Sequence, residues 1–208
     1  MRIKELNADR NYGNWQNRWL AIKSIMEETD PRHLLAAIAK ILNDLKIPYL
    51  ITGGMAVLIW GRPRFTADID IAIELKISDI DKLKDALTAL GKANYIDKNM
   101  MKDAIAHNGE FNFIHGESGV KVDFWVLKNE QFEMSRMERK IKKKINEQPV
   151  YFISPEDLII SKLQWRQISP SSRHMEDIES ILKISGDILD KKYLNSWIEK
   201  LGLEKIVF

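Results

Sequence analysis

The chain has 208 residues and a formal net charge of +2, with 32 Lys and Arg against 30 Asp and Glu. This balance gives no overall attraction to nucleic acid or to a membrane surface, so any basic site must be local. There is no cysteine, which excludes disulfides and thiolate metal sites and leaves carboxylates, histidines and water as metal ligands. The longest apolar runs are too short to span a bilayer, and residues 1–10 lack the apolar region of a signal peptide. We therefore expect a cytoplasmic protein that does not enter the membrane.

Residues 1–30 form a polar N-terminal extension with scattered aromatic side chains, and a helix is expected around residues 15–26. The first strong helix signal is Asp30, a good N-cap, followed by Pro31 and by apolar residues at helical spacing up to Leu45. Residues 47–52 then predict a buried strand. Gly53 and Gly54 end it, and residues 55–60 predict a short buried helix.

Residues 68–74 alternate in a way typical of a β-strand. Ile69, Ile71 and Ile73 share one face. Asp68 and Asp70 therefore stand together on the other face, about 7 Å apart along the strand. At an effective dielectric of about 20 their repulsion is roughly 2 kcal/mol, and a cation between them turns it into attraction. This strand therefore suggests a metal site.

Downstream, we expect a helix over residues 78–90 and a β-hairpin over residues 111–127. Residues 139–145 predict an amphipathic helix, followed by a short strand over residues 150–153 and three further helices. The expected fold class is α/β (α+β), a mixed sheet flanked by helices, with a C-terminal helical domain. We predict three parts: the extension 1–30, a core domain 31–128 and a mainly helical domain 129–208.

Asp123 is a third carboxylate in a β-rich apolar run, where burying an ionised side chain is costly unless it is paired or binds a metal. Together with Asp68 and Asp70 it suggests a site for two divalent ions that hold a triphosphate. Gly53 and Gly54 fit a phosphate cradle at a helix N-terminus, although for a Gly-Gly pair taken alone a tight strand-to-helix turn is the better explanation. Upstream, Arg64 and Thr66 share the parity of Asp68, and arginine suits a phosphate.

These residues resemble the signature of the nucleotidyltransferases of the DNA polymerase β superfamily. That signature is Gly-Gly or Gly-Ser after a strand, D-x-D on the next strand and a third Asp on a later strand, here Gly53 and Gly54, Asp68 and Asp70, and Asp123. The wording R-x-T-x-D-I-D and the segment SPEDLIISKL look most like the AbiEii-type branch, which includes toxins of type IV toxin–antitoxin systems. The resemblance covers about residues 31–208. Because the second turn residue is Gly54 and not serine, a hydroxyl contact to phosphate would come from elsewhere, such as Thr66.

The resemblance implies an NTP-dependent nucleotidyltransferase that uses two Mg²⁺ ions, or Mn²⁺, with Asp68, Asp70 and Asp123 as ligands. It also implies that Lys162 and Asp177 belong to the active site, although on its helix alone Lys162 suits a solvated basic edge better. Relatives of the toxin type add nucleotides to the 3′ end of tRNA, which makes RNA a candidate acceptor and a cognate antitoxin a candidate partner.

Three alternatives stay open at this point. The acceptor can be a protein or a small molecule such as an antibiotic. The chain can be a catalytically silent nucleotide-binding or antitoxin-type protein that kept the fold. In a purely structural interpretation, the aspartates only cap turns or pair with Arg62, Arg64 and Lys121.

Overall fold

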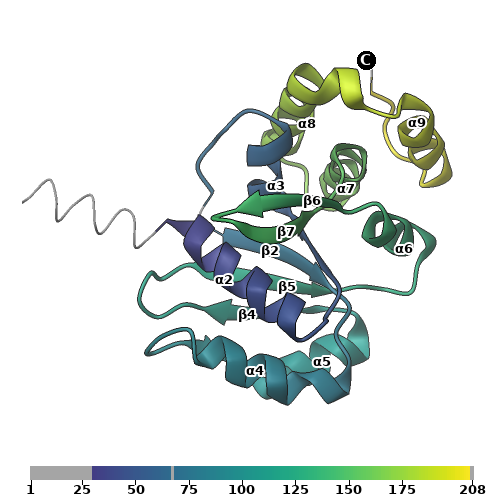
Figure 1. Ribbon diagram of the computed structural model, residues 1–208. Coiled ribbons are helices and arrows are strands. Elements are labelled where there is room, and N and C mark those ends of the chain that lie inside the picture. Colours follow the sequence, from purple (N-terminus) through teal and green to yellow (C-terminus); the bar gives the residue numbers. More distant parts are fainter. Residues whose placement is uncertain (1–29, 67, 207–208) are drawn as a thin grey trace, which may run out of the picture.

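The computed structural model describes residues 30–66 and 68–206, and it consists of one mixed sheet flanked by helices (Figure 1). The sheet has seven strands in the order β3-β4-β5-β2-β1-β7-β6. This is the mixed sheet with flanking helices that the sequence predicts.

The central strands carry the predicted acidic motifs. β2 runs parallel to β5 and antiparallel to β1, and β1 runs parallel to β7. The bounds of these four strands are β1 Tyr49–Thr52, β2 Asp68–Ile73, β5 Lys121–Val126 and β7 Gln148–Phe152. Ile69 and Ile71 are fully buried whereas Asp68 and Asp70 are only partly buried, so the two-residue alternation has the predicted direction.

The outer strands complete the sheet on both sides. β4 pairs antiparallel with β5 in the predicted hairpin, β3 pairs with β4, and β6 pairs with β7. Their bounds are β3 Tyr95–Ile96, β4 Glu110–Ile114 and β6 Ile141–Ile145.

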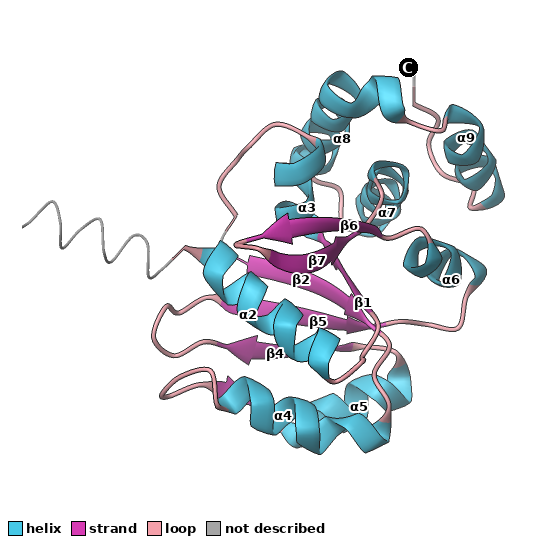
Figure 2. Cartoon of the chain, in the orientation of Figure 1, coloured by secondary structure: helices cyan, strands magenta, loops and turns pink. Residues whose placement is uncertain are grey.

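Two groups of helices flank the sheet (Figure 2). In the first group, α2 contacts β7 and α4, and α4 contacts α5. In the second group, α3 packs on β2 and contacts α7 and α8, while α9 packs on α7. The helix bounds are α2 Pro31–Asp44, α3 Gly53–Trp60, η1 Ile77–Asp79, α4 Ile80–Thr88, α5 Lys98–His107, α6 Gln131–Glu138, α7 Pro155–Ile168, α8 Ser172–Ser185, η2 Gly186–Ile188 and α9 Lys191–Lys200.

Two helices begin at a residue whose side chain caps the first turn. The Asp30 carboxylate accepts a hydrogen bond from the Arg32 backbone N–H at 2.9 Å. The Ser154 hydroxyl accepts one from the Asp157 backbone N–H at 3.1 Å. Each of these side chains satisfies a backbone donor that has no partner within its own helix, which fixes the start of α2 and of α7.

The helix predicted over residues 139–145 is wrong, because α6 ends at Glu138 and Ile141–Ile145 is a strand. Ile141 and Ile145 are four residues apart, a spacing that places two side chains on one face of a helix and also on one face of a strand. Between them Lys143 lies over the Trp60 ring, with its ammonium 4.8 Å from the ring centroid.

The sheet itself crosses the domain boundary predicted near residue 128, because β7 pairs with β1. The helix expected around residues 15–26, like most of the predicted extension, lies outside the described residues. Within residues 30–66 and 68–206, no helix has both the length and the apolar character needed to cross a membrane.

Candidate active site

The turn from β1 into α3 is built around two close approaches that only glycine allows. Gly53 has φ +57°, and a Cβ atom there would lie 1.8 Å from Oδ2 of Asp70. At Gly54 a Cβ atom would lie 2.3 Å from the Thr66 hydroxyl oxygen. The turn therefore packs directly against the Asp70 carboxylate and against Thr66, which precedes β2. Gly54 suits this position because Thr66 occupies the space that a side chain would need.

Asp70 lies at the centre of the carboxylate group. In the parallel pairing of β2 with β5, Asp70 stands opposite Asp123, and Asp68 stands opposite Lys121. Burial raises the pKa of Asp70, and the neighbouring charge of Asp123 raises it further, while a hydrogen bond from the Gly54 backbone N–H acts in the opposite direction. No described cation forms an ion pair with Asp70, so its negative charge is poorly compensated.

Asp123 differs from Asp70 because it already has a cationic partner. The Lys121 ammonium lies 2.7 Å from Oδ2 of Asp123, and this contact raises the pKa of Lys121. The purely structural interpretation, in which the aspartates pair with nearby cations, therefore holds for Asp123 and Lys121. Arg62 is exposed, and no contact with the β2 carboxylates is present in the described residues.

Asp177 of α8 forms ion pairs with both Arg64 and Lys162. Arg64 donates two hydrogen bonds to the Asp177 carboxylate, at 2.8 and 2.9 Å, and Lys162 of α7 donates one at 2.7 Å. Burial alone would raise the pKa of Asp177, but these hydrogen bonds outweigh burial and hold the pKa below its usual value. Lys162 is 8% exposed, so the solvated basic edge is wrong for this residue. The loop before β2, α7 and α8 are therefore tied together beside the carboxylates.

A cavity of about 570 Å³ lies between β2, α3 and α7 and collects most of the predicted site residues. Asp123 and Asp177 do not line it, but each contacts or faces a residue that does. The predicted residues that line the cavity are Gly53, Gly54, Arg64, Thr66, Asp68, Asp70 and Lys162.

The same cavity contains residues to which the sequence motifs gave no role. Trp125 of β5 and Trp165 of α7 form an edge-to-face pair with ring centroids 5.3 Å apart. His174 lines the cavity with its Nδ1 atom buried and without a hydrogen-bond partner in the described residues, and burial followed by the charge of Lys162 lowers its pKa. For the two tryptophans, the sequence signal that could have placed them at the site is their spacing from predicted site residues. Trp125 follows Asp123 by two strand positions, and Trp165 follows Lys162 by nearly one helical turn.

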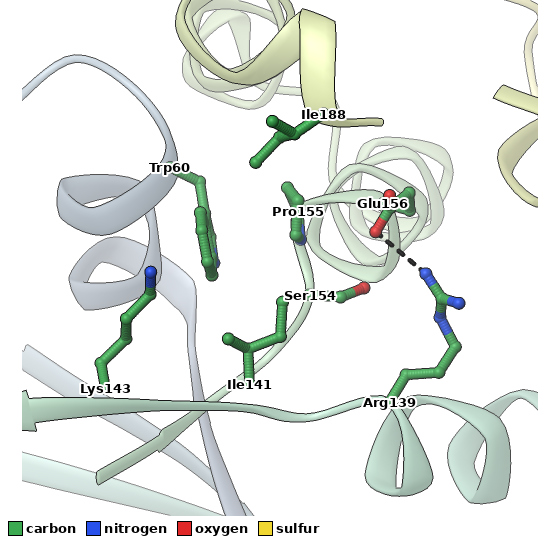
Figure 3. A pocket seen from close by; sticks show the side chains of 8 residues that line it. All are labelled: Trp60, Arg139, Ile141, Lys143, Ser154, Pro155, Glu156 and Ile188. Carbon is green, nitrogen blue, oxygen red and sulfur yellow. Dashed lines mark hydrogen bonds and ion pairs between the residues drawn. The ribbon is translucent and has the colours of Figure 1, made fainter. Parts of the chain in front are cut away.

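A second cavity of about 440 Å³ adjoins the other end of α3, where Trp60 lies (Figure 3). Its walls include the apolar side chains of Trp60, Ile141, Pro155 and Ile188. Its one carboxylate, Glu156, already pairs with Arg139 at 3.0 Å. It therefore offers no group of free carboxylates, and we assign the candidate active site to the larger cavity.

The carboxylates fit a hard divalent cation by their chemistry. Asp68, Asp70 and Asp123 supply only oxygen donors, which Mg²⁺ and Mn²⁺ prefer, and Asp70 forms no ion pair with any described cation. Across the described residues, no three Asp, Glu or His side chains already stand in a metal-binding cluster. The salt bridge from Lys121 holds the Asp123 carboxylate in its present position, so this carboxylate would have to exchange Lys121 for the metal.

Comparisons with known proteins agree with this geometry. A family model described as "Nucleotidyl transferase AbiEii toxin, Type IV TA system" matches residues 33–201. A search among curated proteins gave no match.

Several solved structures share the fold. The antibiotic-resistance factor ANT(2'')-Ia in solution has a TM-score of 0.56 and 15% identity, with 82% of this chain and 90% of that chain covered. Its crystal structure in complex with adenylyl-2''-tobramycin gives 0.54 and 16%, with 82% and 98% covered. An antigenic nucleotidyltransferase-like protein from Paracoccidioides brasiliensis gives 0.51 and 19%, with 82% and 86% covered. At these identities the likeness establishes the fold, and it confirms the predicted nucleotidyltransferase-like mixed sheet.

Proposed function

Because the chain belongs to the AbiEii family of nucleotidyltransferase toxins of type IV toxin–antitoxin systems, we propose that it transfers a nucleoside monophosphate from an NTP to an acceptor. An oxygen of the acceptor attacks the α-phosphorus, the bond between the α- and β-phosphates breaks, and pyrophosphate leaves. The observation that carries this proposal is the pairing of Asp70 with Asp123 beneath the Gly53 turn. The two carboxylates concentrate negative charge beside the glycine turn. This charge suits metal ions that carry the phosphates of an NTP.

Asp68, Asp70 and Asp123 would hold two Mg²⁺ ions, with Mn²⁺ as a substitute. Bound there, the ions supply charge neutralisation for the triphosphate and lower the pKa of the attacking hydroxyl. Asp123 would also take up the proton of that hydroxyl. Its exchange of Lys121 for the metal would free that lysine for solvent or for an anionic ligand.

The triphosphate would lie over the N-terminus of α3. An anion is favoured there by the helix dipole and by the backbone N–H groups of the first turn, although the N–H of Gly54 already donates a hydrogen bond to Asp70. Thr66 lines the same cavity and adds a hydroxyl at the place where Gly54 has none. Backbone donors that are fixed before the substrate arrives need no reorganisation during the reaction.

Arg64 and Lys162 would counter the charge that develops on the leaving pyrophosphate, with Asp177 holding both of them in place. The carboxylate of Asp177 is buried and accepts hydrogen bonds from both cations. The Asp177 carboxylate lowers the positive potential around both side chains. It also fixes their rotamers before the substrate arrives, so less side-chain entropy is lost on binding.

For the acceptor we propose RNA, with the 3′ end of tRNA as the first candidate, and a cytoplasmic setting in which a cognate antitoxin restrains the enzyme. The cations Arg64, Lys162 and Arg173 line the cavity and suit a phosphodiester backbone. The alternative is a small molecule, favoured by the fold shared with ANT(2'')-Ia, which is described in complex with adenylyl-2''-tobramycin. Transfer to a protein is the third candidate.

A silent nucleotide-binding or antitoxin-type protein is the rival from another functional class. It has no need to keep Asp70 and Asp123 opposite each other without a cation. The experiment that separates these possibilities incubates the wild-type chain and Mg²⁺ with each of four α-labelled NTPs and one acceptor pool: total tRNA, lysate protein or an aminoglycoside panel. Labelled tRNA supports the proposal, label only on protein or drug replaces the acceptor, and no label in any pool favours the silent protein.

A further inference from the structure

One corner of the larger cavity is aromatic and apolar. We call it the aromatic corner and define it by Trp125, Trp165 and Ile168, all of which line the cavity. Trp165 is 42% exposed and Ile168 is 74% exposed, although both are large apolar side chains. They face the same cavity as Asp68 and Asp70. Exposed apolar groups inside a polar reaction cleft indicate a ligand with an apolar face.

The corner lies beside the carboxylates on two separate elements. On β5, Trp125 follows Asp123 by two positions on the same face of the strand, about 7 Å further along. It stands opposite Ala72 of β2, whose small side chain leaves room above the sheet. On α7, Trp165 follows Lys162 by three positions. The rings of Trp165 and Trp125 meet edge to face. A ligand in the corner therefore lies two strand positions beyond the pair formed by Asp70 and Asp123.

Two chemistries suit a tryptophan face: a planar ring that stacks on it, and an ammonium group that binds through a cation–π contact. The charges that line the cavity discriminate between them. Once Asp68 and Asp70 hold divalent ions, the remaining lining charges are mainly positive, and they repel a polycation. The cationic side chains that line the cavity are Arg64, Lys128, Arg136, Lys162 and Arg173, and the other acidic ones are Glu130 and Glu133. The balance favours a flat ring carried on an anionic backbone.

We propose that the aromatic corner binds the terminal base of an RNA acceptor, stacked against Trp165 next to the attacking hydroxyl. This inference rests on the proposed nucleotidyl transfer and names the subsite that selects its acceptor. The base of the incoming NTP is a poorer fit, because the triphosphate is assigned to the α3 turn, whereas Trp125 lies on the same strand face as Asp123, the carboxylate assigned to the acceptor hydroxyl.

The test compares two fluorescent oligoribonucleotides that differ only in the terminal nucleotide, one with its base and one abasic, so that both keep the same phosphates and hydroxyl. Binding is measured by anisotropy with the full chain, Mg²⁺ and a non-hydrolysable NTP. Because base–aromatic stacking has a typical magnitude of a few kcal/mol, the wild type should bind the base-bearing strand at least about fivefold more tightly.

The variants identify the side chain responsible. Trp165→Ala should lose this preference while it binds the NTP analogue as the wild type does, and Trp165→Phe should keep most of it. Ile184→Ala is the matched control, because Ile184 is 57% exposed on α8 and does not line the cavity. Melting temperatures check that each variant is folded.

Several outcomes overturn the inference: equal wild-type binding of both strands, an unchanged preference in Trp165→Ala, or tobramycin binding that Trp165→Ala weakens. Failure of the proposed function is distinguishable from these. If the wild type prefers the base-bearing strand but transfers no nucleotide to it, the subsite stands and the reaction is wrong. If it transfers nucleotide equally well to both strands, the reaction stands and the subsite is wrong.

Discussion

Replacing Asp70 by asparagine should stabilise the metal-free protein. Asp70 carries a partly buried charge opposite Asp123, and none of the described cations pairs with it. Asparagine removes the charge but keeps an amide oxygen that can accept the hydrogen bond from the Gly54 N–H. The variant therefore loses the repulsion without losing the contact.

The size of the effect follows from the strand pairing. Adjacent strands lie about 4.8 Å apart, and two carboxylates about 5 Å apart repel by roughly 3 kcal/mol at an effective dielectric of about 20. The Gly54 N–H and the charge of Lys162 act against this repulsion at Asp70, as Lys121 does at Asp123. We therefore expect a net gain of about 1 kcal/mol, or about 2 to 4 °C in melting temperature for a chain of this size.

The gain should depend on pH in a defined direction. The pKa of Asp70 is raised in the folded state, so its neutral form supports the fold at low pH, and this support is lost as the pH rises through the folded pKa. The advantage of Asp70→Asn should accordingly be small near the pKa of an unperturbed aspartate, about 3.9, and should grow as the pH rises towards neutrality.

Thermal melts in EDTA at several pH values measure this, with Asp187→Asn as the control because Asp187 is exposed on η2. With Mg²⁺ and a non-hydrolysable NTP the order should reverse. A ligand at 100 times its Kd adds about 2.7 kcal/mol to the wild type, whereas Asp70→Asn should gain much less. A large loss of melting temperature for Asp70→Asn in EDTA would refute the reasoning, because it would mean that the carboxylate stabilises the fold.

Lys162→Ala should lower the rate of nucleotide transfer at least about tenfold, or roughly 1.4 kcal/mol of transition-state stabilisation, and should leave the fold intact because Arg64 still pairs with Asp177; an unchanged rate would remove Lys162 from the site. Gly54→Ala should cost about 1 to 3 kcal/mol of stability through overpacking, and Thr66→Gly in the same chain should recover much of this loss, since the atoms nearest to the new Cβ belong to Thr66; a double variant as unstable as the single one would contradict this. Because the pKa of His174 is lowered, the wild type should lose stability as the pH falls below about 6.5 while the unfolded chain takes up a proton that the folded chain resists. His174→Gln should lose less over the same range, and parallel melting curves for the two proteins would be evidence against a perturbed histidine.

Much of the sheet and the positions of the acidic residues could be predicted from local patterns. The alternation of isoleucine with Asp68 and Asp70 gave both the strand and the shared face, because a strand side chain points opposite to its neighbours. The cap at Asp30 gave the start of α2, because a capping side chain acts on its own first turn.

Contacts between distant segments could not be predicted in this way. Residues 141–145 look helical when taken alone, and only pairing with β7 makes them a strand. The partner of Arg64 is Asp177, which is 113 residues away, and no local spacing shows that link. Trp165 looked like an ordinary helix residue until β5 and α7 brought it against Trp125.

The most direct measurement of the proposed reaction follows two labels in the same NTP. The wild-type chain, Mg²⁺ and total tRNA are incubated with NTP labelled at either the α- or the γ-phosphate. Nucleotidyl transfer predicts that the α-label appears on the acceptor and the γ-label appears in pyrophosphate, and that both signals vanish in EDTA and in Asp70→Asn. A γ-label on the acceptor, or an α-label that survives in EDTA and in Asp70→Asn, would contradict metal-dependent nucleotidyl transfer at these carboxylates.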